Sequence, residues 1–151
     1  GSSATPRKTV TDAASGAPAS TTRRTARRVA ATVALACIVA GGLAVHLVLP
    51  DTAGSDIAGD ALYAVAVYAG VVLVAPGVRP AMAAGLAAGW CVAVELFQLT
   101  GIPIQASVAF PPAVLVLGTV FDPRDLFVYP LAVGVAWAID ASVSSRLTRR
   151  R

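Results

Sequence analysis

Charged, aromatic and chemically reactive side chains are scarce in this sequence of 151 residues. Only 13% of the residues are charged, 6% are aromatic, and the chain has a single histidine. Cys37 and Cys91 lie in separate apolar runs without a C-x-x-C spacing, which predicts reduced thiols rather than a disulfide or a zinc site. The sequence also lacks the H-E-x-x-H and G-x-S-x-G patterns of hydrolases. We therefore expect no metal, no cofactor and no nucleophilic catalytic residue.

Apolar residues are abundant instead, at 56% of the chain, a composition typical of membrane proteins. The formal net charge is +4, but the basic residues are concentrated near the two ends. This charge describes the tails rather than a continuous basic surface, which argues against nucleic acid as a partner. Membrane lipids are the expected surroundings.

Four stretches of the sequence are apolar enough to be spans, given that a helix needs about 20 residues to cross a bilayer. These candidate spans are residues 29–49, 57–75, 81–101 and 126–139. A cleavable signal peptide is the alternative for the first, but the run is long for a signal and no small-x-small cleavage pattern precedes Asp51. The last stretch crosses only if its helix begins near Asp122, where Asp122-Pro123-Arg124-Asp125 fits a helix start.

The segment 101–121, which contains Pro103, Pro111 and Pro112, is too short to cross a bilayer. We therefore predict an all-α fold, a four-span transmembrane helix bundle with a short interfacial or re-entrant helix before the last span. The predicted organisation is a disordered cytoplasmic tail (1–22), a membrane domain (23–141) and a basic cytoplasmic tail (142–151). With both ends in the cytoplasm, eleven of the twelve basic residues fall on that side, as the positive-inside rule favours.

Polar residues gather at the outer end of this predicted bundle. Glu95 and Gln98 share a face of the third span because they are three residues apart in a helix. A charged side chain at the membrane centre costs about 2.5 to 3.5 kcal/mol, so such residues usually face a cavity or a partner. We predict an outward-facing polar pocket lined by Glu95, Gln98, Asp60, Asp125, Arg124 and His46.

Several of these residues also have a structural interpretation. Asp60 and Asp125 fit first-turn acids at a helix dipole, and His46 fits a membrane-interface residue. Arg124 fits an ion pair with Glu95 or Asp125 as well as phosphate binding. For Glu95 a functional role is favoured over a structural one.

Gly85 and Gly89 lie four residues apart in the third span and form a small-xxx-small seam. Such a seam allows close helix packing, which we predict here. The same seam permits association between copies of the chain, as a homo-oligomer or as a scaffolding subunit.

Three short patterns occur in a fixed order along the chain. They are Gly59-Asp60-Ala61-Leu62-Tyr63-Ala64, Glu95-x-x-Gln98-Leu99 and Leu117-Gly118-x-x-Phe121-x-x-x-Asp125-Leu126-x-x-Tyr129. Together they resemble the bacterial membrane family known as domain of unknown function 2809, which is distantly similar to the VanZ-like proteins linked to glycopeptide (teicoplanin) resistance. The resemblance covers about residues 33–139.

This resemblance implies a small four-span protein of the bacterial inner membrane in which Glu95, Gln98, Asp60 and Asp125 line an outward polar site. Family members carry an arginine before the Leu-Gly pair, and residues 106–116 contain none. Arg124 substitutes for that arginine, or the contact is lost.

The favoured hypothesis is a protein of the cell envelope that binds a lipid-linked or head-group ligand, such as a lipid-linked envelope precursor, with Arg124 and Gln98 as donors. One alternative is a small proton-coupled transporter in which Glu95 changes protonation. Another is a scaffolding subunit of a membrane complex. A carboxylate-only enzyme built on Glu95, Asp60 and Asp125 stays open but is less favoured.

Overall fold

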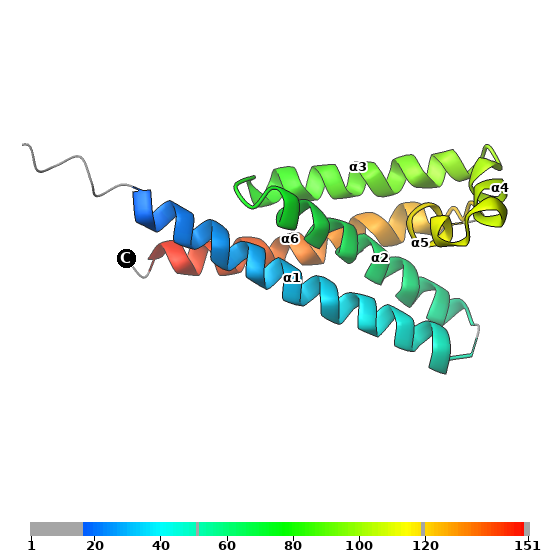
Figure 1. The fold of residues 1–151 in the computed structure, drawn as a ribbon, viewed down its shortest axis with the longest axis horizontal. Coiled ribbons are helices and arrows are strands. Elements are labelled where there is room, and N and C mark those ends of the chain that lie inside the picture. The colour runs from blue at the N-terminus through cyan, green and yellow to red at the C-terminus, as the bar shows by residue number, and fades with distance from the viewer. Residues whose placement is uncertain (1–16, 51, 119, 150–151) are drawn as a thin grey trace, which may run out of the picture.

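The computed structural model describes residues 17–50, 52–118 and 120–149, and these residues are predominantly helical. The helices are α1 (Ala17–Val48), α2 (Ala53–Val74), α3 (Pro80–Gln98), α4 (Ile102–Ala109), the 3-10 turn η1 (Pro111–Ala113), α5 (Val114–Leu117) and α6 (Asp125–Arg149). Four of them, α1, α2, α3 and α6, are long and apolar enough to cross a membrane (Figure 1). The described residues contain no strand. The predicted four-span helix bundle with a short helix before the last span is confirmed.

The first and last helices extend further than the sequence analysis placed them. Helix α1 begins at Ala17, inside the segment expected to be a disordered tail, while residues 1–16 lie outside the described residues. Helix α6 continues to Arg149 and so includes most of the expected basic tail. Neither residues 19–40 nor residues 135–149 contain a glycine or a proline, so nothing local stops either helix where the apolar run stops.

Local sequence sets the start of the two middle spans. Thr52 caps α2: its hydroxyl accepts a hydrogen bond from the Ser55 backbone N–H at 3.2 Å, and the Ser55 hydroxyl accepts one from the Thr52 N–H at 2.9 Å. Helix α3 starts at Pro80, a position where the missing N–H costs nothing. Short loops therefore make α1, α2 and α3 antiparallel neighbours.

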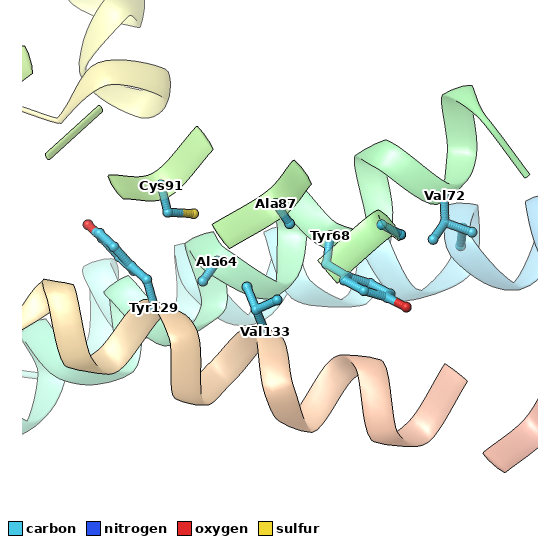
Figure 2. Packing of buried hydrophobic residues seen from close by; sticks show 9 residues of the cluster. Ala64, Tyr68, Val72, Ala87, Cys91, Tyr129 and Val133 are labelled. Atoms are coloured by element: carbon cyan, nitrogen blue, oxygen red, sulfur yellow. The ribbon is translucent and has the colours of Figure 1, made fainter. Parts of the chain in front are cut away.

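Three of the spanning helices, α2, α3 and α6, pack against one another, and α1 packs along α2. The buried face of α3 is a line of small residues, Ala83, Ala87 and Cys91, each 0% exposed. Small residues allow helix backbones to approach closely. In Figure 2, Ala87 lies close to Ala64 of α2 and Val133 of α6, between the helices.

The predicted packing role of Gly85 and Gly89 within the chain is wrong. Both residues are exposed, and a Cβ built on either meets no atom within 4 Å. The reason is helix phase, because a shift of two residues from Ala83 and Ala87 turns about 200° around the helix and so reaches its opposite face. Association between copies through these glycines stays a prediction.

The outer surface of the bundle is apolar along each spanning helix. No more than 28% of any spanning window is buried inside the protein. The large side chains that point outward include Leu86, Phe127 and Leu131, which are 53%, 80% and 73% exposed. A surface of this kind is compatible with hydrocarbon rather than water, so the chain is a multi-pass membrane protein.

An ion pair that was not predicted from the sequence joins α1 to α6 at the end of the bundle where α1 begins and α6 ends (Figure 1). The Arg27 guanidinium donates to both carboxylate oxygens of Asp140, at 3.2 Å from Nε and 2.5 Å from Nη2. Its Nη1 donates to the carbonyl oxygens of Pro76 and Val78 in the α2–α3 loop. The Tyr68 hydroxyl of α2 donates to Asp140 at 2.7 Å. Arg27 and Asp140 thus connect three of the spans, α1, α2 and α6, to the loop that precedes α3.

We expect Asp140→Ala to lower the free energy of unfolding by about 2 kcal/mol, the usual size for hydrogen bonds to a charged group. The guanidinium of Arg27 would keep its carbonyl partners but lose its counter-charge. Unfolding of the purified protein in mixed micelles by increasing sodium dodecyl sulfate measures the change. Arg28→Ala is the control, since Arg28 donates a single, solvent-exposed hydrogen bond to the Leu73 carbonyl. Equal stability of the two variants would contradict the role of the pair.

Substitution of Ala87 by leucine should destabilise the bundle by about 1 to 3 kcal/mol, because the larger side chain overpacks the α2–α3–α6 contact. Gly85→Leu, on the opposite face of α3, should leave the unfolding of the single chain unchanged because its site is open. The same denaturation assay at low protein concentration compares the two. A loss of stability in Gly85→Leu as large as in Ala87→Leu would show that α3 is rotated from the position described here.

Candidate functional site

A group of buried polar side chains lies at the opposite end of the bundle, where α3 ends and α2 and α6 begin. Glu95 is 0% exposed, Asp125 6% and Gln98 8%. Toward this end the pair α1–α2 diverges from α3 and α6, and the short helices α4 and α5 lie beside the ends of α3 and α6 (Figure 1). The structure therefore brings together polar residues from elements that are far apart in the sequence.

Glu95 fixes the segment that leads into α6. It lies one turn after Cys91 on the buried face of α3, so its side chain points toward α6 rather than outward. Its Oε1 accepts a hydrogen bond from the backbone N–H of Asp122 at 2.5 Å. Its second oxygen, Oε2, is buried and has no hydrogen-bond partner among the described residues. One oxygen of the Glu95 carboxylate thus stabilises the fold, and the other is left for a further hydrogen bond.

Gln98, on the next turn of α3, holds the end of α5. Its Nε2 donates to the carbonyl oxygen of Leu117 at 2.8 Å, while its Oε1 is buried without a partner in the described part of the chain. The next residue, Gly118, has a φ of +60°, and a Cβ there would collide with the Gln98 amide. Only glycine satisfies both the left-handed backbone and the close approach, which explains the Leu-Gly pair of the third pattern.

Asp125 and Tyr129, one turn apart in α6, form the third part of the site. The Tyr129 hydroxyl donates to Asp125 Oδ2 at 3.2 Å, and Oδ1 of Asp125 is buried with no described partner. The Asp60 carboxyl of α2 lies next to that of Asp125. Two neighbouring carboxyl groups repel one another when both are ionised, so this pair favours a proton or a cation beside it.

Two tyrosines, Tyr63 and Tyr129, lie side by side in the site. The rings of Tyr63 and Tyr129 are 6.1 Å apart and inclined at 56°. The Tyr63 hydroxyl donates to the Val116 carbonyl oxygen at 2.6 Å and accepts from the Trp90 indole N–H at 3.1 Å. Tyr63 therefore links α2 and α3 to the segment before α6.

Arg124 does not pair with Glu95 or Asp125, and the predicted ion pair with either of them is wrong. Its Nε and Nη2 donate to Asp122 Oδ2 at 2.9 Å and 2.5 Å, and its backbone N–H donates to Asp122 Oδ1 at 2.9 Å. A partner two residues away in the same turn is reached without burying the guanidinium, which lies in a side chain 45% exposed.

This local pair changes the acidity of both groups. The hydrogen bonds from Arg124 lower the pKa of Asp122 below its ordinary value. The hydrogen bond and charge of Asp122 raise the pKa of Arg124. The turn built by the pair, in which the Asp125 N–H donates to the Asp122 carbonyl, precedes α6, so the helix begins at Asp125 rather than at Asp122.

Two adjoining cavities connect these residues. The larger, of about 520 Å³, lies between the end of α1, the start of α2 and the segment 120–125. The smaller, of about 260 Å³, lies between α2, α3, α5 and α6. Asp60 and Asp125 line both cavities, and so stand at their junction.

The predicted site residues are distributed over this pair of cavities. His46, which is exposed, and Arg124 line only the larger cavity, and Gln98 lines only the smaller one. Glu95 lines neither, because its side chain is turned toward the Asp122 backbone behind the cavity walls.

Four further residues of the site were not predicted as site residues from the sequence: Asp56, Tyr63, Gly118 and Tyr129. Tyr63, Gly118 and Tyr129 are all within the recognised patterns, and the i, i+4 spacing of Asp125 and Tyr129 was a readable signal for a hydrogen bond within one helix. Asp56 lines the larger cavity one turn before Asp60, at a spacing that also places it on the same helix face.

Comparison with known proteins gives a family match. The profile of the family described as "Protein of unknown function (DUF2809)" matches residues 50–135, more than half of the chain. The matched range contains every predicted pocket residue except His46. No curated protein and no solved structure matches the chain.

We expect Glu95→Ala to loosen the segment before α6, because the Asp122 N–H loses its acceptor, while Glu95→Gln retains an oxygen at that position. Amide hydrogen exchange of peptides covering residues 118–124 measures the effect. Exchange should be about ten times faster in the alanine variant, the equivalent of about 1.4 kcal/mol for one lost hydrogen bond, and close to wild type in the glutamine variant. Unchanged exchange in Glu95→Ala would rule out this role.

Proposed function

Because the chain belongs to the DUF2809 family, whose function is unknown, we propose a function from its site: this small integral membrane protein binds the polar head group of a lipid or lipid-linked ligand at the acidic end of the bundle. The observation that carries the proposal is a pair of buried oxygen atoms on residues of the cavity wall, Gln98 Oε1 and Asp125 Oδ1, which have no hydrogen-bond partner among the described residues. Leaving such an atom unpaired costs about 1 to 3 kcal/mol. A ligand that pairs with these atoms recovers that free energy.

The position of the cavities supports a ligand that arrives with its tails in the membrane. Gln98 and Asp125 line a cavity that lies at the end of the spanning helices, at the depth where lipid head groups begin. The outer faces of the helices around it are apolar and face hydrocarbon. A lipid can thus keep its chains in the bilayer while its head group enters the site.

The distribution of charge supports one orientation of the bundle in the membrane. The arginines at the start of α1, in the α2–α3 loop and at the end of α6 lie at one end of the bundle, and the acidic site lies at the other. With the basic end in the cytoplasm of a bacterium, both termini are cytoplasmic and the site faces outward from the inner membrane. We therefore propose that the ligand is an envelope lipid or a lipid-linked envelope precursor, in a VanZ-like role.

Binding is favoured over proton-coupled transport by the packing below the site. Ala64, Ala87 and Cys91 are each 0% exposed and fill the space between the acidic site and the Arg27–Asp140 pair. A transported proton or ion would have to cross this apolar layer. A second candidate function, assembly with another membrane subunit, is favoured by one observation, the exposed and unobstructed Gly85 and Gly89.

Head-group binding is tested by native mass spectrometry of the full chain released from mixed micelles that contain a diacyl phospholipid mixture or diacylglycerol, which has no head group. Wild-type protein should retain phospholipid in a saturable manner and retain diacylglycerol at least about ten times more weakly, a difference of about 1.4 kcal/mol. Asp125→Leu should lose this preference, because leucine has no acceptor and shortens the polar wall of both cavities.

Gly85→Leu serves as the matched control, since it places the same side chain on the outer face of α3, away from the cavities. It should retain phospholipid as the wild type does. Equal retention of phospholipid and diacylglycerol by the wild type, or an undiminished preference in a folded Asp125→Leu variant, would refute head-group binding.

A further inference from the structure

On the basis of the proposed head-group binding, we infer that the group held in the site is a primary ammonium rather than a phosphate. The inference follows from the hydrogen-bonding state of the side chains in and behind the cavity walls. The three buried side-chain atoms that have no partner in the described part of the chain are all oxygen acceptors: Gln98 and Asp125 line the smaller cavity, and Glu95 lies behind its wall. A ligand that satisfies them must bring hydrogen-bond donors.

Each of the main side-chain donor groups of the site already makes a hydrogen bond within the protein. The Gln98 amide donates to Leu117, the Tyr129 hydroxyl to Asp125 and the Tyr63 hydroxyl to Val116. Arg124 is engaged twice by Asp122. The Gln98 amide and the Arg124 guanidinium keep further N–H hydrogens, but Gln98 is uncharged and the charge of Arg124 is already paired with Asp122. A phosphate would therefore meet no unpaired arginine or lysine among the residues that line the two cavities.

The charged side chains that line the larger cavity also favour a cationic ligand over a phosphate. Its walls carry Asp56, Asp60, Asp122 and Asp125, together with His46 and a single arginine, Arg124, which is paired with Asp122. Asp60 and Asp125, at the junction of the two cavities, have no basic partner in the described part of the chain. A cavity lined by an excess of carboxylates attracts cations and repels phosphate.

An organic ammonium fits this site better than a metal ion. Among the described residues, no three His, Cys, Asp or Glu side chains are grouped as metal ligands would be. Every hydrogen of a primary ammonium is a donor, so one such group can reach several acceptors on different helices. The smaller cavity, of about 260 Å³, has room for a group of several heavy atoms, given that a water molecule takes about 30 Å³ of liquid volume.

Phosphatidylethanolamine and phosphatidylcholine provide a matched pair of probes. Both head groups carry one positive nitrogen and one phosphate, but only the ethanolamine nitrogen has hydrogens to donate. In native mass spectrometry of the full chain, we expect phosphatidylethanolamine to bind at least about ten times more tightly than phosphatidylcholine. The preference should fall to about twofold or less in Asp125→Asn, which replaces an unpaired acceptor by a group that also carries donors.

Asp140→Asn is the matched control, because it makes the same substitution on α6 at the opposite end of the bundle, away from both cavities, and should keep the preference for phosphatidylethanolamine. Thermal unfolding of each variant verifies that it is folded. Dissolved ethanolamine distinguishes the source of the amine: stabilisation of wild type but not of Asp125→Asn indicates a free amine as ligand, and stabilisation by the lipid alone indicates a head group. Both results support the ammonium class.

The remaining outcomes separate this inference from the proposal on which it rests. Equal binding of the two lipids, with both lost in Asp125→Leu, would overturn the ammonium and leave head-group binding in place. Tightest binding of phosphatidylglycerol, which is anionic and has no amine, would do the same. Lipid binding that is identical in wild type and in folded Asp125→Leu would overturn both proposals.

Discussion

Hydrocarbon cannot solvate a buried polar group, and this constraint determines how the four spans are arranged. The acids of the described bundle lie near its two ends, and Glu95, Asp125 and Asp140 are each hydrogen-bonded by another segment or by their own helix. On α6, Asp125 is bonded by Tyr129 and Asp140 by Tyr68 and Arg27. The hydroxyls of the two tyrosines point toward opposite ends of the apolar cluster (Figure 2). Between these polar ends, small apolar residues bring the helices close.

Much of this arrangement could be predicted from the sequence because bilayer thickness sets span length. Four apolar runs gave four spans, and the prolines of residues 101–121 gave a short helix that does not cross. Once the spans alternate in direction, Asp60, Glu95, Gln98 and Asp125 must meet at one end, since each lies near the corresponding end of its span. Most of the site therefore followed from counting residues along helices, and the patterns identified the DUF2809 family.

The rest depended on helix rotation and on local competition, which the sequence does not encode simply. An apolar helix has no polar face that shows which side is buried, so the pair Gly85 and Gly89 fits a packing seam as well as the pair Ala83 and Ala87 does. Only the structure shows that the alanines are the buried pair. Arg124 had several acids within reach and bonds the one in its own turn. Arg27 and Asp140 are 113 positions apart and belong to runs with no shared pattern.

The contact between Trp90 and Tyr63 gives the protein an optical reporter. The chain has two tryptophans. The Trp90 indole donates to Tyr63, which itself holds the Val116 carbonyl beside the smaller cavity. Movement of the segment over that cavity therefore changes the hydrogen bonding and wetting of one indole ring, on which its fluorescence depends. Trp137, on the half of α6 that leads to Asp140, supplies a reference emission that such movement leaves unaltered.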